Sequence, residues 1–212
     1  SVSETTEGVH IHIIDAELMG KGEKEKKDLY IEGVQNNGII NHYEYIINSE
    51  GTIEIRHVLK PEGKMPLWFP RIGLTLTVSD ALDQVKWYGR GPQENYPDRK
   101  TGYPMGIYAS TVQAMYEPYL MPQDYGLRTD VRWLQLTTDK GIGLQFKMNE
   151  WFNFNIYPYS TDNLTKAMYT YQLQKQKGMT LNLDYATTGV GCTARGVFGA
   201  YKAMPQEYRR TI

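Results

Sequence analysis

Hydrophobic and polar residues alternate along most of the chain with the period of two that is typical of β-strands. From Tyr43 to Leu59 (YEYIINSEGTIEIRHVL), two alternating runs flank the polar segment 48–51, which predicts a β-hairpin with its turn at that segment. Other short runs are rich in β-branched and aromatic residues, end at Gly, Asn, Asp or Pro, and predict strands at 72–78, 131–138, 142–148, 152–160, 169–174 and 180–186. Many short strands separated by turns predict an all-β fold, an antiparallel β-sandwich.

Two segments depart from this strand pattern. The stretch 160–169 (STDNLTKAMY) predicts one short helix, with Ser160 or Thr161 as its N-cap. The segment 20–28 (GKGEKEKKD) has seven charges within nine residues. So many charges cannot be buried together, and they predict a solvated loop or an exposed strand end.

The composition is that of a protein with a substantial hydrophobic core. The chain has 212 residues, of which 41% are hydrophobic and 22% charged, and we expect residues 1–212 to form a single domain. The formal net charge is −1, from 23 basic and 24 acidic residues, so no overall field would attract nucleic acid. No apolar run is long enough to cross a bilayer, and no membrane partner is expected. The single cysteine, Cys192, cannot form an internal disulfide and is expected to be a small buried thiol.

All four histidines lie within the first 57 residues. His10 and His12, in the run VHIHII, are two positions apart on a predicted strand, so their rings leave the same face at roughly 6 to 7 Å from each other. Two such rings could begin a metal site, but a third ligand would have to come from elsewhere in the chain. We favour the alternative that both rings belong to the polar face of an edge strand, and we predict no metal and no cofactor.

The common catalytic motifs are missing from the sequence. It contains no Cys-x-x-Cys, His-Glu-x-x-His or Gly-x-Ser-x-Gly, so zinc and serine-hydrolase interpretations have no support. The run 189–196 (GVGCTARG) has the glycines of a phosphate-binding loop, but it lacks Lys-Ser/Thr and opens no predicted helix, which favours a plain flexible loop. Aromatic residues near turns, among them Trp87, Tyr119 and Trp151, could stack on sugar rings or belong to the core, and the sequence leaves both open.

The stretch from Trp87 to Arg99 (WYGRGPQENYPDR) concentrates charged side chains between strand-like segments. Glu94 and Asp98 could be the acid and base of a glycoside hydrolase, which needs two carboxylates about 5 to 10 Å apart around the scissile bond. Alternatively, Arg90 and Arg99 could bind carboxylates and fix an irregular backbone that has no sheet partners. The chemistry alone favours the structural alternative and leaves the catalytic one open.

Several motifs occur together in an order known from one family. The stretch above reads Trp-x-Gly-x-Gly-Pro-x-Glu-x-Tyr-x-Asp-Arg. It is followed by Tyr116-Glu117-Pro118-Tyr119, Pro122-Gln123-x-x-Gly126-Leu127-Arg128, Phe154-x-x-x-Pro158-Tyr159-Ser160, Leu183-Asp184 and Gly189-Val190-Gly191. In this combination the chain resembles the C-terminal, small-chain-like domain of large bacterial β-galactosidases of glycoside hydrolase family two. The match is best over 70–209 and weak over the strands of 1–69.

This resemblance implies a fold and a function. The family's domain is a large two-sheet supersandwich of the galactose-mutarotase-like type. Its parent enzyme hydrolyses terminal non-reducing β-D-galactose residues with retention, using two glutamates on a separate, preceding (β/α) barrel. Such a barrel needs ~200 residues or more, and the predicted strands leave no room for one. We therefore expect the chain to be part of a longer enzyme and inactive alone.

In that enzyme the chain would complete the active-site wall and support the fold or a homo-oligomer. Its partners would be the preceding barrel and a β-galactoside, in a bacterial cytoplasm or periplasm. Two alternatives stay open, a free-standing carbohydrate-binding module and a mutarotase-like sugar epimerase. The epimerase would need a histidine and a carboxylate, whereas every histidine here precedes the best-matched region.

The resemblance also implies roles for individual residues. The catalytic groups belong to the barrel, and a structural motif is formed by Trp87, Arg90, Glu94, Tyr96, Asp98 and Arg99. In the family, the loop after Gly-Val-Gly supplies a tryptophan that stacks on the sugar. Here that loop has no Trp, and we expect Arg195, Phe198 or Tyr201 to contact the substrate instead.

Overall fold

The computed structural model describes residues 1–6, 8–18, 38–191 and 196–212. Their strands form two sheets, one of five strands and one of six, and all the strand pairings are antiparallel. The all-β, antiparallel class predicted from the alternating pattern is confirmed. The charged segment 20–28 and Cys192 lie outside the described residues.

The chain divides into two compact units. One comprises 1–69 and 204–212, and the other comprises 70–203. The boundary falls where the family motifs begin to match well in the sequence. The expectation that residues 1–212 form a single domain stays a prediction.

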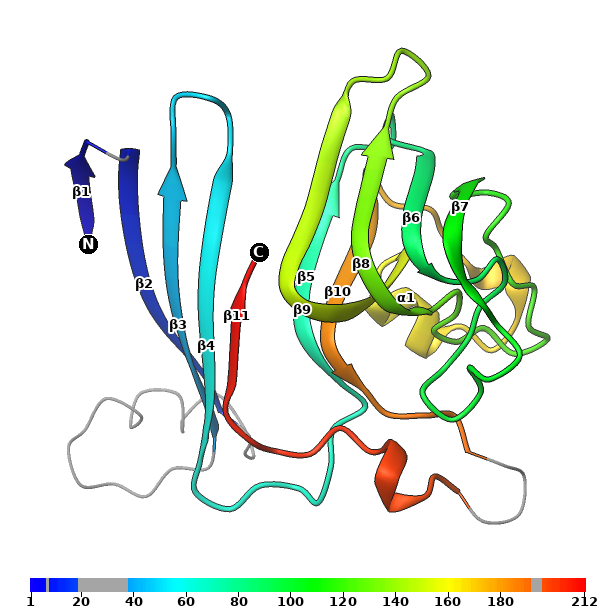
Figure 1. Cartoon of the computed structure of the whole chain (residues 1–212). Coiled ribbons are helices and arrows are strands. Elements are labelled where there is room, and N and C mark those ends of the chain that lie inside the picture. Colours follow the sequence, from blue (N-terminus) through cyan, green and yellow to red (C-terminus); the bar gives the residue numbers. More distant parts are fainter. Residues whose placement is uncertain (7, 19–37, 192–195) are drawn as a thin grey trace. The chain divides into compact units, whose positions relative to one another are not determined.

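The first unit is a sheet with the strand order β1-β2-β3-β4-β11 (Figure 1). Its strands are β1 (Val2–Thr5), β2 (Gly8–Leu18), β3 (Gly38–Ile47), β4 (Ile53–Glu62) and β11 (Tyr208–Thr211). β3 and β4 form the predicted hairpin, and the Asn48 side chain accepts hydrogen bonds from the backbone N–H groups of Glu50 and Thr52 in its turn. β11, drawn in red, pairs with β4 and so brings residues 208–211 into the same sheet as the first strands.

One face of this sheet buries a polar pair. His57 on β4 is 1% exposed, and its Nε2 lies 3.0 Å from Oδ1 of Asn41 on β3. The His57 ring also stacks on Tyr43, with 4.2 Å between the ring centroids. Burial lowers the pKa of His57 to about 4, because desolvation disfavours the imidazolium ion. His57 is therefore neutral at pH 7 and serves as a hydrogen-bonded part of the sheet.

The second unit contains a sheet with the strand order β5-β10-β9-β8-β6-β7. Its strands are β5 (Arg71–Val78), β6 (Gln84–Arg90), β7 (Met105–Thr111), β8 (Arg128–Thr137), β9 (Gly143–Tyr157) and β10 (Met179–Thr187). The central strands share one apolar core, which includes Trp87, Leu134, Phe152, Phe154 and Leu181. Each of these side chains is at most 1% exposed. Close packing of such large side chains makes this sheet a rigid base for the loops that leave it.

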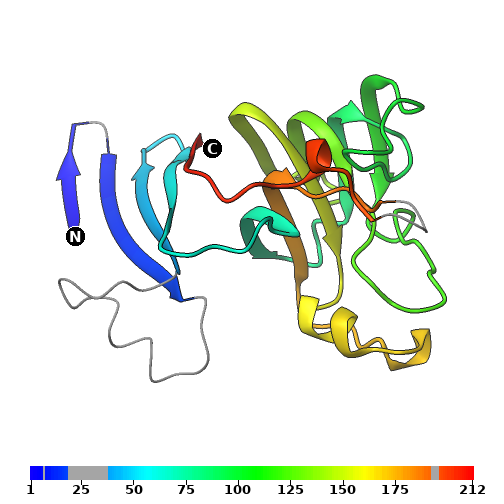
Figure 2. The ribbon, with the colours of Figure 1, turned by 90° about the horizontal axis from the view of Figure 1, so that it is seen from below.

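The short predicted helix is confirmed. α1 (Thr161–Lys166) follows β9 and lies at one end of the β9–β10 pair (Figure 2). Ser160 is its N-cap, because the Ser160 side chain accepts a hydrogen bond from the backbone N–H of Asn163 at 3.1 Å. Within the described residues, no helix is long and apolar enough to span a membrane.

Two of the predicted strands are joined into one. The runs 142–148 and 152–160 are predicted as separate strands, but β9 continues through the residues between them. The register of β9 against β8 shifts between Val131 and Trp133. A bulge in β9 therefore takes up the extra residues between Lys147 and Phe152. The polar residues Asn149 and Glu150, which follow the run 142–148, had suggested a turn at this place.

The run 169–174 was wrongly predicted as a strand. It contains the 3-10 helix η2 (Thr170–Gln172), and the Gln172 side chain caps its start by accepting hydrogen bonds from the backbone N–H groups of Met168 and Tyr169. The alternating tyrosines Tyr169 and Tyr171 are exposed and stack on each other, with 5.5 Å between centroids. Their spacing reflects this surface pair, not a pleated strand.

Candidate functional site

The stretch from Trp87 to Arg99 begins in β6 and packs back onto the sheet. Trp87 is fully buried, and its Nε1 donates a hydrogen bond to the backbone oxygen of Arg90 at 3.0 Å. The next peptide bond, between Gly91 and Pro92, is cis. A Cβ atom on Gly91 would lie 2.8 Å from the Tyr108 ring and 3.0 Å from the Trp87 ring, so only glycine lets the backbone pass this close to both rings.

Arg90 binds a carboxylate outside the stretch. Its Nε donates to Oδ2 of Asp130 at 2.6 Å, and its Nη1 donates to the backbone oxygens of Lys100 and Tyr103 at 3.1 and 2.9 Å. Nζ of Lys100 lies 2.9 Å from the other oxygen of Asp130. Burial disfavours the ionised form of Asp130, but the hydrogen bonds from Lys100 and Arg90 outweigh it and lower the pKa of this carboxyl. Asp130 thus holds two cations against the sheet.

The Glu94 carboxylate is surrounded by neutral donors. Its Oε2 accepts hydrogen bonds from the Tyr96 hydroxyl at 3.0 Å and from the backbone N–H of Gly126 at 2.8 Å, and its Oε1 accepts one from the Tyr119 hydroxyl. Burial, together with the negative charge of Glu94, raises the pKa of both phenols above the ordinary value. Both therefore stay protonated and remain donors, and Glu94 ties the stretch to 119–126.

Arg128 supports the same junction from β8. Its Nη1 donates to the backbone oxygen of Gly126 at 2.8 Å and its Nη2 to that of Pro92 at 2.9 Å. Its guanidinium carbon lies 5.5 Å from the centroid of the Trp87 ring. Burial lowers the pKa of Arg128 to about 10, which still leaves it charged at pH 7. Carbonyl oxygens and an aromatic face replace part of the water that this cation has lost, and its buried Nε has no hydrogen-bond partner among the described residues.

Asp98 and Arg99 reach across the sequence to the Gly-Val-Gly segment. Oδ1 of Asp98 accepts a hydrogen bond from the backbone N–H of Val190 at 3.0 Å, and Oδ2 accepts one from that of Gly191 at 2.7 Å. Nη2 of Arg99 donates to the backbone oxygen of Gly191 at 2.8 Å. A Cβ atom on Gly189 would lie 2.4 Å from the carboxyl carbon of Asp98. We call these contacts the Asp98–Arg99 clamp, which holds Val190 and Gly191 at the start of the loop that follows β10.

The clamped loop closes on itself at η3 (Gly199–Tyr201). The backbone N–H of Gly189 donates to the backbone oxygen of Tyr201 at 2.9 Å, and that of Ala203 donates to Oγ1 of Thr188 at 2.9 Å. Within the loop, the side chains of Phe198 and Tyr201 are 62% and 40% exposed. Arg195, the third residue expected to contact substrate, lies outside the described residues. The structure therefore brings Phe198 and Tyr201 together on one anchored loop.

Glu94 and Asp98 do not pair with the arginines of their own stretch in any of the described contacts. Each oxygen of the two carboxylates accepts a hydrogen bond from a backbone N–H or a phenol. Except for Tyr96, these partners lie 25 to 93 positions away along the chain. The sequence could therefore not identify them. Asp130, which binds Arg90, was missed for the same reason.

A second polar group, to which sequence reasoning gave no role, lies on β5, β9 and β10. Nη2 of Arg71 donates to Oδ2 of Asp184 at 3.0 Å and to Oδ1 of Asn155 at 3.3 Å. The same nitrogen lies 3.3 Å from Oδ2 of Asp124, which is outside these strands. Burial raises the pKa of Asp184 to about 7. Burial lowers the pKa of Arg71, but the charges of Asp184 and Asp124 raise it on balance. The available signal was a single acidic residue, Asp184, within an otherwise uncharged strand.

This fold and clamp occur in a chain that matches a known family over almost its whole length. Residues 5–212 match the family described as β-galactosidase small chain, and the protein belongs to that family. The β-galactosidase of Priestia megaterium is 38% identical over 147 residues, which are 69% of this chain and 14% of that protein. The β-galactosidase of Vibrio cholerae is 39% identical over 122 residues, which are 58% of this chain and 11% of that protein.

The chain thus spans 11 to 14% of the length of these relatives. The family match includes residues 5–69, which belong to the region that the sequence motifs covered only weakly. The predicted resemblance to β-galactosidases, which are glycoside hydrolases, is confirmed. The carbohydrate-binding module and the sugar epimerase are not favoured. Placement in family two and at the C-terminal end of a parent enzyme stays a prediction.

Proposed function

We propose that this chain is the C-terminal part of a family-two β-galactosidase and that its clamped loop completes the wall of the galactoside-binding site. The parent enzyme would hydrolyse terminal non-reducing β-D-galactose residues. The observation that carries the proposal is the Asp98–Arg99 clamp, which anchors a loop with exposed Phe198 and Tyr201 to a close-packed sheet. Aromatic faces held on a rigid support are suited to stacking on the CH groups of a sugar ring.

In this proposal, the chain contributes no catalytic acid, base or nucleophile. A general acid or base must have an oxygen within reach of the proton that it transfers. Each oxygen of Glu94 and Asp98 already accepts at least one hydrogen bond from a phenol or a backbone N–H. The catalytic glutamates would belong to the preceding barrel. Trp87, Arg90, Glu94, Tyr96, Asp98 and Arg99 would act as structure.

Phe198 is the residue that we propose to stack on the sugar. It is the more exposed of the two loop aromatics, and its backbone oxygen accepts a hydrogen bond from the N–H of Tyr201 at 3.0 Å. Tyr201 is in turn tied to Gly189, next to the clamp. A chain of backbone contacts therefore fixes Phe198 relative to Asp98. Arg195 would add a charged donor for sugar hydroxyls.

The proposal also includes a supporting role for the first unit. Its sheet exposes Ile13, Ile14 and Ile53, at 44%, 60% and 55%. Apolar side chains of this size gain free energy when they are removed from water. We propose that they pack against other parts of the parent enzyme or against a second copy in a homo-oligomer.

The test uses a hybrid in which this chain replaces the matched segment of the Priestia megaterium β-galactosidase. Hydrolysis of a chromogenic β-galactoside would be measured for the hybrid and for its Phe198→Ala and Ile107→Ala variants. Ile107 is a matched control, because it is 63% exposed on β7, outside the clamped loop. Loss of one stacking contact should lower kcat/KM by about tenfold, which corresponds to about 1.4 kcal/mol. Equal values of kcat/KM for the two variants would contradict the proposed role of Phe198.

A further inference from the structure

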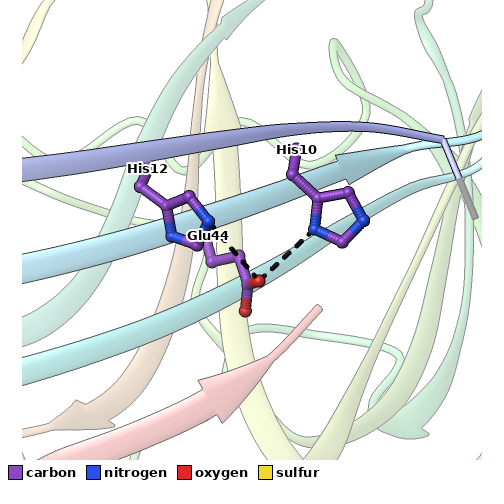
Figure 3. A group of neighbouring side chains, drawn as sticks. All are labelled: His10, His12 and Glu44. Carbon is purple, nitrogen blue, oxygen red and sulfur yellow. Dashed lines mark ion pairs between the residues drawn. The ribbon is translucent and has the colours of Figure 1, made fainter. Parts of the chain in front are cut away.

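His10, His12 and Glu44 converge on one face of the first sheet (Figure 3). β2 and β3 are paired with His12 opposite Glu44, and His10 leaves the same face two residues along β2. Nδ1 of His10 lies 3.5 Å and Nε2 of His12 lies 3.8 Å from Oε1 of Glu44. The neighbouring strand thus supplies the third ligand that the two histidines lacked in the sequence.

The strand that carries both histidines is held on both sides. β2 lies between β1 and β3, with His10 opposite Ser3 on β1, so the edge-strand interpretation of these histidines is wrong. The His10 side chain is 13% exposed, and its Nε2 is buried without a hydrogen-bond partner among the described residues. Nδ1 is therefore the His10 nitrogen that can reach a ligand. His12 is 49% exposed and leaves the group open to solvent.

The spacing of the three side chains suits a small cation with short bonds. The ligand atoms all lie within 4.8 Å of one another. A tetrahedral Zn²⁺ ion binds nitrogen and oxygen at about 2.0 to 2.2 Å, so its ligand atoms lie about 3.3 to 3.5 Å from each other. The two distances to Glu44 are close to this value, and small side-chain rotations would bring the third pair into range.

Arg56 on β4 orients the Glu44 carboxylate. Its Nη1 lies 3.1 Å from Oε2 of Glu44, so Oε1 is left to face the histidines. Nε of Arg56 lies 2.6 Å from Oε1 of Glu54, and this carboxylate balances much of the positive charge of Arg56. The Arg56 side chain is also 51% exposed to water. A hydrogen bond to the second oxygen of a ligating carboxylate is a common way to fix a metal ligand.

We propose that His10, His12 and Glu44 bind a divalent transition-metal ion, Zn²⁺ before the others, with its fourth position open to water. Two imidazoles and one carboxylate suit Zn²⁺, Ni²⁺ or Cu²⁺, whereas Mg²⁺ and Ca²⁺ prefer oxygen ligands alone. The ion links β2 to β3. It would therefore stabilise the first unit, independently of any role of this protein in galactoside hydrolysis.

Isothermal titration of the purified protein with ZnCl₂ and with MgCl₂ tests this site. We expect one Zn²⁺ per chain and no detectable Mg²⁺ binding. His12→Ala and Glu44→Gln should each weaken Zn²⁺ binding by about tenfold or more. His42→Ala is the matched control, since His42 is exposed and its register opposite Ile14 puts it on the same face, outside the group.

Two further readouts distinguish the site from chance binding by surface histidines. Co²⁺ bound in a tetrahedral site should give strong visible absorption that His12→Ala removes and His42→Ala keeps. Zn²⁺ should raise the Tm of the wild type and of His42→Ala, because binding to the folded state stabilises it, but not the Tm of a folded His12→Ala protein. Absence of Zn²⁺ binding by the wild type, or equal weakening by His42→Ala and His12→Ala, would overturn the proposal.

Discussion

Oδ2 of Asp98 accepts a hydrogen bond from the backbone N–H of Gly191 at 2.7 Å, although the two residues are 93 positions apart. The contact joins the two most recognisable motifs of the chain, the stretch that ends at Arg99 and the loop that begins at Gly189. A hydrogen bond to a charged group contributes about 1.5 to 3 kcal/mol. Val190 donates to the same carboxylate, so Asp98 makes two hydrogen bonds to the segment that leads to Phe198.

The first prediction concerns the clamp itself. Asp98→Asn would place an amide donor against one of two backbone N–H groups. We expect the free energy of unfolding to fall by about 1 to 3 kcal/mol and the loop to become more sensitive to protease. Urea unfolding and limited proteolysis measure the two effects. Asp139→Asn, in an exposed turn, serves as the control, and a clamp variant that behaves like it would show that the contact stabilises nothing.

The second prediction uses the contact of Asp98 with Gly189. In Gly189→Ala the new methyl group would lie 2.4 Å from the carboxyl carbon, so the carboxylate must move and lose its backbone donors. A loss of about 1 to 3 kcal/mol in the free energy of unfolding is expected. In Gly199→Ala, the new methyl group has no described residue beyond its own 3-10 turn within 4 Å, and stability should change by less than about 0.5 kcal/mol. Equal stabilities for the two variants would refute this close contact.

The third prediction separates a structural from a catalytic role for Glu94. Glu94→Gln replaces one acceptor oxygen by a donor facing Tyr96, Tyr119 or Gly126. We expect the protein to lose about 1 to 3 kcal/mol of stability. In the hybrid enzyme, any loss of kcat should accompany that destabilisation and be relieved at lower temperature. A hybrid with unchanged stability and no chemical step would instead identify Glu94 as a catalytic residue.

The fourth prediction is a pH dependence of stability. The pKa of His57 falls from 6.5 in the unfolded chain to about 4 in the folded one, so the unfolded state takes up a proton first as the pH falls. Stability due to this group is complete above about pH 6.5 and declines as the pH falls towards 4, by up to about 3 kcal/mol. Urea unfolding of the wild type and of His57→Gln over this range measures the difference. If the free energy of unfolding changed with pH in the same way for the two proteins, the lowered pKa of His57 would be contradicted.

Local elements of the fold were predictable because their signals are local. Asn48 marked the hairpin turn, and Ser160 marked the start of α1. The run 169–174 misled because Tyr169 and Tyr171 alternate as a strand would, whereas the Gln172 side chain caps a 3-10 turn there.

The site was predictable only in part. The sequence identified Glu94 and Asp98 as a charged group but not their acceptor roles, since their partners come from distant backbone and phenol groups. Glu44 was missed as a neighbour of His10 and His12 because only the register of β2 against β3 brings it to them. Pairings between distant strands depend on the whole fold, and no local pattern specifies them.

The proposed function is tested most directly by hydrolysis of a chromogenic β-galactoside by three proteins. These are the isolated chain, the Priestia megaterium β-galactosidase without its matched segment, and the hybrid that carries this chain in place of that segment. We predict no turnover by the first two and restored turnover by the hybrid. Robust turnover by the isolated chain, or full activity of the shortened enzyme, would contradict the proposed function.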